Sequence, residues 1–206
     1  MTPSAHNWFE DCQNLTDIHS ECWLRLSESI QDRNSGWRLP VLATETDNGL
    51  RQRILVLRHV DTEQQKLFAH TDLRSAKVAQ IQRQPNVTWL FYDQSQQVQL
   101  HVHSMVSIHT NDDIADRFWA SEPTSSLRCY LGHQAPGTVC RQPEHNLPDC
   151  VRGRIPDRSE VQPGRTNFAV IVAQVTEIEW LKLNQQGNLR ARFFPFDNHP
   201  SEWLAP

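Results

Sequence analysis

The feature that most restricts the fold is an alternation of apolar and polar residues from residue 37 to residue 72, in WRLPVLATETDNGLRQRILVLRHVDTEQQKLFAHTD. A period of two is typical of β-strands with one buried face. The turn Asp47-Asn48-Gly49 and the polar residues 61–65 divide this stretch at two points. The pattern therefore predicts three strands in an antiparallel meander.

The rest of the chain mixes strands and helices. Two strands are predicted in VTWLFYD and QVQLHVHSMVSIHT, and two more in FAVIVAQVTEIEWLKL and LRARFFPF. Apolar residues at helical spacing predict one or two helices in residues 1–35, a helix from about Asp72 to Arg83, one capped by Asn111 and a short one closed by Gly132. About six antiparallel strands interrupted by helices predict a closed barrel with helical insertions.

The segment 133–165 has little periodicity. It contains five prolines and three glycines among many charged residues, which predicts a long irregular excursion. A structureless loop of this length inside a compact domain is usually a functional lid or a disordered segment.

Composition narrows the class of protein. The chain has 206 residues, 38% of them hydrophobic, and a net charge of −4, which predicts one domain over residues 1–206 and no nucleic-acid partner. No apolar run approaches the ~18 residues of a membrane span and no signal peptide is evident, so we expect a cytoplasmic protein without a membrane segment. Five cysteines without a close pair predict reduced thiols.

The stretch TDLRSAK, residues 71–77, places hydroxyls and cations around the start of a predicted helix. Cations there oppose the helix dipole, which favours negative charge at that end. The free N–H groups of a helix start, beside Ser75 and Lys77, can bind a phosphate. The alternative is an ordinary capped surface helix with solvated charges.

Four motifs, in order, resemble those of the pyridoxamine 5′-phosphate oxidase-like FMN-binding split-barrel family: RQRILVLR, HTDLRSAK, QQVQLHV and EWLKLNQQGNLRARF. The resemblance runs from about Trp37 to Pro206, and the terminal WLAP is also similar to the oxidase's ending. It implies a mainly β fold, a six-stranded antiparallel split β-barrel with peripheral helices. It also implies FMN as cofactor, a homodimer with FMN at its interface, a small-molecule substrate and an FMN-dependent oxidoreductase activity.

The resemblance also assigns residues to the flavin. The implied FMN contacts are Arg53, Ile54, Leu55, Val56, Leu57, Arg58, His70, Thr71, Arg74, Ser75, Lys77, Gln97, Gln134, Trp180 and Arg192. Arg53, Lys77 and Ser75 suit a phosphate, whereas Gln97 and Arg192 suit the isoalloxazine ring. Arg190 and Arg192 are the candidate catalytic residues. Taken singly, Gln97 is also interpretable as a turn residue and Trp180 as a core aromatic.

The positions that bind the substrate in the oxidase differ in this chain. Arg58 replaces a lysine, Phe118 a tyrosine and Glu122 an arginine, and Asn188-Leu189-Arg190 replaces arginine-leucine-histidine; Ser126 is kept, and Ala76 fills a basic position after Ser75. An acid in place of a phosphate-binding arginine repels a substrate phosphate. We therefore expect an altered substrate site, or alternatively a non-catalytic sensor or carrier of FMN, haem or a deazaflavin.

A metal site is a weaker hypothesis. The candidate ligands are His101, His103, Cys129, Cys140, His145 and Cys150, whose spacing is wide and uneven. His101 and His103 are two apart on a predicted strand and should face one side. We expect no bound metal.

Overall fold

The computed structural model describes residues 8–9, 12, 14–195 and 199–206. In this part of the chain nine strands form one antiparallel sheet, β1 (Val41–Thr46), β2 (Gly49–Ile54), β3 (Leu57–Asp61), β4 (Lys66–Asp72), β5 (Asn86–Asp93), β6 (Val98–His109), β7 (Phe168–Lys182), β8 (Leu189–Phe193) and β9 (Glu202–Leu204). The order is β2-β1-β5-β6-β7-β4-β3, and β8 joins β7 and β9. The predicted mainly antiparallel fold with peripheral helices is confirmed.

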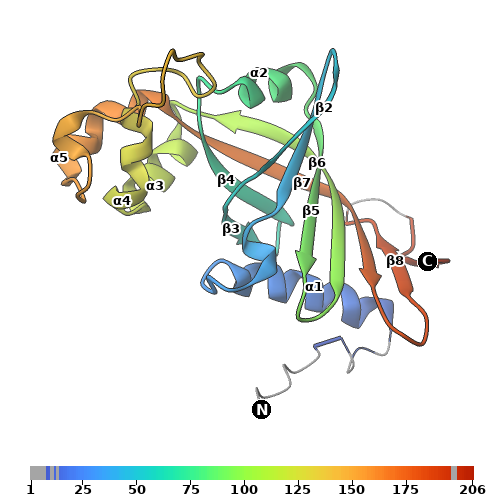
Figure 1. Cartoon of the computed structure of the whole chain (residues 1–206). Coiled ribbons are helices and arrows are strands. Elements are labelled where there is room, and N and C mark those ends of the chain that lie inside the picture. The colour runs from blue at the N-terminus through green and yellow to red at the C-terminus, as the bar shows by residue number, and fades with distance from the viewer. Residues whose placement is uncertain (1–7, 10–11, 13, 196–198) are drawn as a thin grey trace.

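The strand count and the closure of the barrel differ from the prediction. Nine strands form instead of the six of the predicted barrel. Strands were predicted in seven segments, β9 was not foreseen, and the second strand of the predicted meander is broken at Leu55 and Val56. There the Leu55 N–H donates to the Pro40 carbonyl at 3.0 Å. Its two halves, β2 and β3, form the two ends of the hydrogen-bonded path, and no ladder between them is found among the described residues. The sheet curls without closing (Figure 1).

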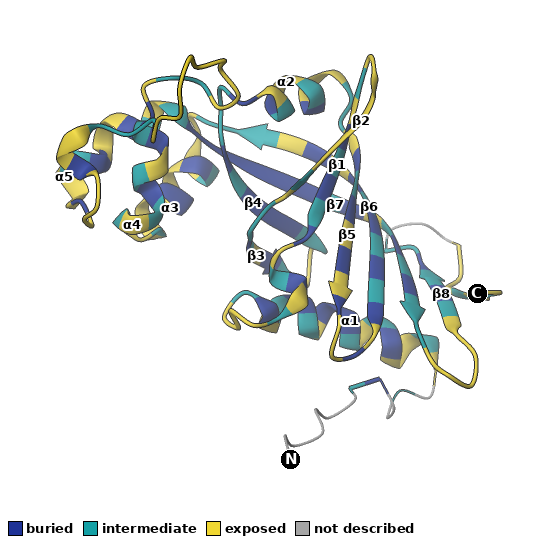
Figure 2. Cartoon of the chain, viewed as in Figure 1, coloured by how far each residue is buried: buried dark blue, intermediate teal, exposed yellow. Residues whose placement is uncertain are grey.

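The interior of the curled sheet holds the larger hydrophobic core. Trp89, Leu100, Val102 and Ile178 from β5, β6 and β7 are fully buried there. Helix α1 (Leu15–Ser29) covers one end of this core with its buried face. Along the strands, buried residues alternate with exposed residues that point to the outer face of the sheet (Figure 2). This is the alternation that the sequence predicted.

A second, smaller cluster lies on the other face of β4 and β7. Phe68, Phe168 and Val170 from these strands pack against Phe118 and Trp119. The helices beside it are α3 (Asp113–Ser121), α4 (Thr124–Leu127), the 3₁₀ helix η2 (Arg128–Leu131), α5 (Arg158–Val161) and the 3₁₀ helix η4 (Gln162–Asn167). Two further 3₁₀ helices are η1 (Gly36–Arg38) and η3 (Asp149–Val151).

Helix starts differ from the predictions by one to four residues. Helix α2 (Ala76–Arg83) follows Ser75 rather than beginning at Asp72, because Asp72 still pairs with Phe168 in the sheet. Helix α3 is capped by Asp112 instead of Asn111, and the Ala115 N–H donates to its side chain at 2.9 Å. Segment 133–165 is irregular over its first half but includes η3, α5 and part of η4 in its second. The first residues of the predicted N-terminal helical segment lie outside the described residues.

No helix of the described residues is long and apolar enough to cross a bilayer.

Candidate functional site

A polar cluster forms where β4 ends and α2 begins. The Lys77 ammonium donates to the Thr71 hydroxyl at 3.0 Å and to the Ser75 hydroxyl at 2.9 Å. The Ser75 hydroxyl in turn donates to the Asp72 carbonyl at 2.6 Å. Ser75 is the N-cap of α2, yet its side chain caps no backbone N–H of the helix. The predicted hydroxyls and lysine are thus gathered at a helix start.

Arg53 of β2 extends this cluster. Its Nη1 donates to the Thr44 hydroxyl at 2.6 Å, and its Nη2 donates to the Gln80 side-chain oxygen at 3.1 Å. We call Arg53, Thr71, Ser75 and Lys77 together the basic cradle. Neither Thr44 nor Gln80 was predicted, although a threonine at a buried position of an alternating strand is a signal for a polar partner.

The two cations of the basic cradle have only neutral hydrogen-bond partners. Among the described residues no Asp or Glu forms an ion pair with Arg53 or Lys77, because Asp72 pairs with Arg74. Burial, and then the Arg53 charge, lower the pKa of Lys77. Burial and the Arg51 charge lower the pKa of Arg53. Partly desolvated cations that repel each other are stabilised by an anion, so the donor set fits a phosphate.

Arg74 and Gln134 lie beside the cradle but have other partners. The Arg74 guanidinium pairs with Asp72 at 2.7 Å and donates to the Gly132 carbonyl at 2.9 Å. The Gln134 backbone forms two hydrogen bonds of 2.9 Å with the Asn146 side chain. Arg74 thus links the loop that carries Gln134 to the turn between β4 and α2. Its charge is balanced by Asp72 without a ligand.

Ile54, Leu55, Val56 and Leu57 surround the break between β2 and β3. Ile54 is exposed at the end of β2, whereas Leu57 is fully buried. The backbone here leaves the ladder with β1 and enters the ladder with β4. Their predicted contacts to a flavin stay a prediction.

Three further predicted flavin residues, Gln97, Trp180 and Arg192, lie at the opposite end of the sheet. Thr71 pairs with Ala169 of β7, whereas Arg192 pairs with Glu179 of β7. Ala169 and Glu179 are ten residues apart along β7, which is about 30 Å at roughly 3.3 Å a residue. Within one chain, the basic cradle and Arg192 are therefore too far apart to contact the same small ligand.

At this far end the two predicted arginines have acidic partners within the chain. Arg190 pairs with Glu179 at 2.7 Å, and the Arg192 Nε donates to Glu202 at 3.0 Å. Trp180 is buried in the larger core, where its ring lies 5.6 Å from that of Phe9. Gln97 is exposed in the turn between β5 and β6, with a φ of 52°. The interpretation of Trp180 as a core aromatic therefore describes its position.

Arg58, Glu122 and His70 converge on the side of β4 away from the larger core. Arg58 Nη1 lies 3.4 Å from Glu122 Oε2, and His70 Nδ1 lies 3.6 Å from Glu122 Oε1. The ring of Phe118 is 5.2 Å from that of His70. Three altered substrate positions, Arg58, Phe118 and Glu122, thus meet beside the predicted flavin contact His70, whereas Arg190 lies at the far end of the sheet.

Metal ligands do not gather in the described part of the chain. No group of three His, Cys, Asp or Glu residues there could hold a metal ion. His101 and His103 do face one side, with ring centroids 4.7 Å apart.

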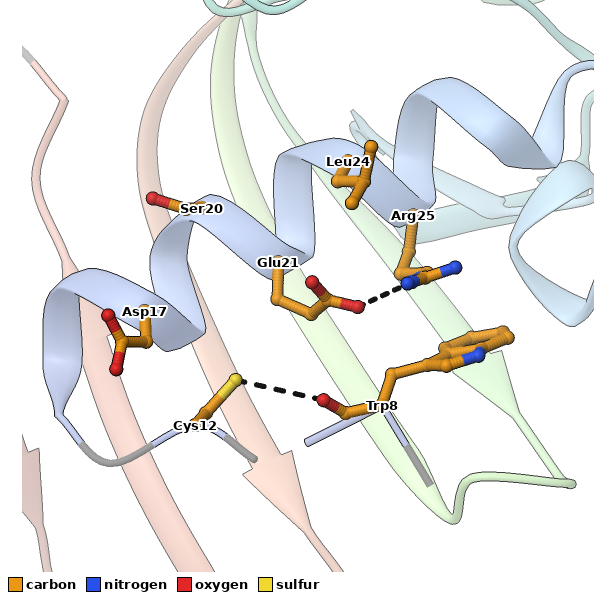
Figure 3. A pocket seen from close by; sticks show the side chains of 7 residues that line it. All are labelled: Trp8, Cys12, Asp17, Ser20, Glu21, Leu24 and Arg25. Carbon is orange, nitrogen blue, oxygen red and sulfur yellow. Dashed lines mark hydrogen bonds and ion pairs between the residues drawn. The ribbon is translucent and has the colours of Figure 1, made fainter. Parts of the chain in front are cut away.

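The pocket of Figure 3 lies along the outer side of α1, away from the basic cradle. It has a volume of about 410 Å³ and is lined by Trp8, Cys12, Asp17, Ser20, Glu21, Leu24 and Arg25. Arg25 pairs with Glu21 at 2.5 Å and lies over the ring of Trp8. The charged groups at its centre are thus paired with each other.

Comparison with known proteins indicates a family. Residues 20–110 match the model of the pyridoxamine 5′-phosphate oxidase, FMN-binding domain family, and this segment contains the whole basic cradle. Over this segment, which is less than half of the chain, the sequence is similar to that family, and FMN is the cofactor of the matched domain. No curated protein matches the chain.

Solved structures share the fold of this chain at low identity. A pyridoxamine 5′-phosphate oxidase-related, FMN-binding protein from Nostoc punctiforme has a TM-score of 0.68 and 22% identity, over 94% of this chain and 99% of that one. PhzG from Burkholderia lata, in complex with tetrahydrophenazine-1-carboxylic acid, has a TM-score of 0.66 and 15% identity, over 98% of each chain. At these identities the likeness concerns the fold alone.

Proposed function

We propose that the protein is an FMN-dependent oxidoreductase related to pyridoxamine 5′-phosphate oxidase, with an altered substrate site. The observation that carries the proposal is the basic cradle, in which two partly buried cations have no carboxylate partner among the described residues. A phosphate with nearly two negative charges offers both cations charge-assisted hydrogen bonds.

Each residue of the cradle has a separate task in this proposal. Lys77 and Arg53 neutralise the FMN phosphate, and the Ser75 and Thr71 hydroxyls fix its orientation through their bonds to the Lys77 ammonium. The start of α2 adds N–H groups and its dipole. When bound, the flavin supplies the electron-transfer chemistry, which no side chain supplies.

We further propose a homodimer with FMN between its subunits. The strand register places Ile54, Leu90, Tyr92 and Met105 on the outer face of the sheet, and all four are exposed. An apolar face of this kind on a sheet is typical of an interface. A second copy would also bring Gln97 and Arg192 of one subunit to the basic cradle of the other. Light scattering at micromolar concentration should give the dimer mass, and a monomer would contradict this part of the proposal.

The substrate is expected to differ from pyridoxamine 5′-phosphate. Glu122 contacts Arg58, so the cation nearest the substrate position is already balanced by an acid. Lost phosphate contacts reduce both the affinity and the orientation of the reacting carbon. The flavin-loaded protein should form little hydrogen peroxide and pyridoxal 5′-phosphate beside an authentic oxidase. A comparable kcat/KM would contradict the altered substrate site.

Turnover itself has a direct test. Native mass spectrometry of the purified protein identifies the bound ligand by its mass. Bleaching of the yellow protein by NAD(P)H or another donor, followed by recolouring in air, is the expected behaviour of an oxidoreductase. Yellow protein that stays inert to every donor would instead be a flavin carrier or sensor.

A further inference from the structure

An acid and a histidine whose side chains are largely buried lie between the sheet and the helical layer. Glu122, the residue that ends α3, comes from the helical side, and His70 comes from β4. The His70 side chain is 3% exposed and that of Glu122 is 13% exposed. Arg58 of β3 covers them from the solvent side, with its side chain 26% exposed.

Two polar atoms of this cluster lack a hydrogen-bond partner. They are His70 Nε2 and Glu122 Oε2, both buried, within the described residues. The Arg58 guanidinium approaches Glu122 Oε2 only to 3.4 Å, too poorly aligned to form a hydrogen bond. A buried polar atom without a partner is costly, and such atoms in a native fold call for a bound group.

Both unpartnered atoms accept hydrogen bonds. Burial, and then the Arg58 charge, lower the pKa of His70 to about 3, so its ring is neutral near pH 7. With the ring proton on Nδ1, which faces Glu122, Nε2 is an acceptor. The carboxylate oxygen of Glu122 is an acceptor as well. The cluster therefore calls for a donor.

We propose that His70 and Glu122, beside Arg58, bind a nitrogen head group that donates hydrogen bonds, such as an amidine, amine or amide, on the organic substrate. This inference rests on the proposed function in that the substrate would lie beside the flavin. It narrows the substrate class from an unspecified molecule to one with such a head group. A phosphate or carboxylate is excluded from this position because Glu122 would repel it.

Arg58 is the side chain that an entering ligand would displace. Its guanidinium is the most exposed part of the cluster and forms no hydrogen bond with Glu122. An entering cation or amide can take its place on the Glu122 carboxylate, while the Phe118 ring, 5.2 Å from His70, supplies an apolar wall. Arg58 and the ligand thus compete for one carboxylate.

The test compares three probes of the same shape, benzamidine, benzamide and benzoate, by calorimetric titration of the full-length protein with and without added FMN. Benzamidine and benzamide should bind at least about tenfold more tightly than benzoate, which corresponds to about 1.4 kcal/mol. Glu122→Gln should lower the affinity for benzamidine by about tenfold. Glu63→Gln, an exposed turn position, is the matched control and should change nothing.

A variant that binds benzamidine more tightly than the unmodified protein cannot be explained by misfolding. Arg58→Ala removes the competitor, so it should tighten benzamidine binding several-fold, an effect that misfolding does not produce. Benzoate binding as tightly as benzamidine, no binding of benzamidine, or the same benzamidine affinity in Glu122→Gln as in the unmodified protein would each overturn the inference. Failure to bind FMN counts separately, against the proposed function, because the order of the probes is measured without FMN too.

Discussion

Two groups of basic residues, at opposite ends of the same sheet, differ in how their charges are balanced. Arg53 and Lys77 of the basic cradle bond to hydroxyls and an amide oxygen. Arg190 and Arg192 at the far end pair with Glu179 and Glu202. All four are predicted site residues, but only the first two form no ion pair with an acid of the described residues.

This difference in charge balance distinguishes a site that can gain energy from an anionic ligand from an ion pair that needs none. A partly buried cation without an acid raises the free energy of the empty protein, and an anionic ligand recovers that energy on binding. A partly exposed ion pair has less to gain, since its charges already balance each other and are partly screened by water. Binding energy for FMN should therefore be concentrated in the basic cradle.

The largest expected effect comes from the cradle itself. Changing Lys77→Ala together with Ser75→Ala removes a charged and a hydroxyl contact, each of ~1–3 kcal/mol. The affinity for FMN should fall at least about tenfold, as measured by quenching of flavin fluorescence in a titration of apo-protein.

Arg83→Ala is the matched control for this change. Arg83 lies on the same helix and pairs with Asp47 on the surface, so its loss should leave the dissociation constant nearly unchanged. An unaltered FMN affinity in the double variant would show that the basic cradle contributes no more to FMN binding than the ion-paired arginines do.

The pH dependence of FMN binding is the next largest effect. Burial, and then the Arg53 charge, lower the pKa of Lys77, so its charge is lost at a lower pH than that of an ordinary lysine. FMN affinity should be full below this pKa and should fall as the pH rises through it. Lys77→Arg keeps its charge at alkaline pH, so a plot of dissociation constant against pH should be flatter for this variant. Parallel curves for the two proteins would show that Lys77 does not bind the phosphate.

Much of the fold was predictable from local pattern. Strands β5 and β6 follow from alternation because each has one face in the core. The first half of β7 is an apolar run that is buried on both faces. The break at Leu55 and Val56 was not predictable, since residues 54–57 are a continuous apolar run, which is also typical of an unbroken buried strand. The single turns of η3 and α5 are too short to show a helical period.

The candidate site was predictable in its local part. Thr71, Ser75 and Lys77 lie within seven residues, so a turn brings them together. Arg74 could not be assigned from sequence, because its pairing with Asp72 depends on the path of the turn. The separation of the cradle from Arg192 depends on the register along β7, which the sequence does not specify.

The smallest effect is expected at the far end of the sheet. Arg192→Ala should weaken FMN binding by only roughly two- to fivefold, because an exposed charge is screened and its partner Glu202 must be displaced first. Glu202→Gln frees the guanidinium and should strengthen binding by a similar factor at low salt. Both changes should shrink as salt is added, whereas the loss in the cradle double variant should largely persist, since its contacts are partly buried. The opposite result would be a larger loss of FMN affinity in Arg192→Ala than in the cradle double variant, unchanged by added salt. The binding energy would then lie at the ion-paired end of the sheet, and the pairing of charges in the free chain would not identify the ligand site.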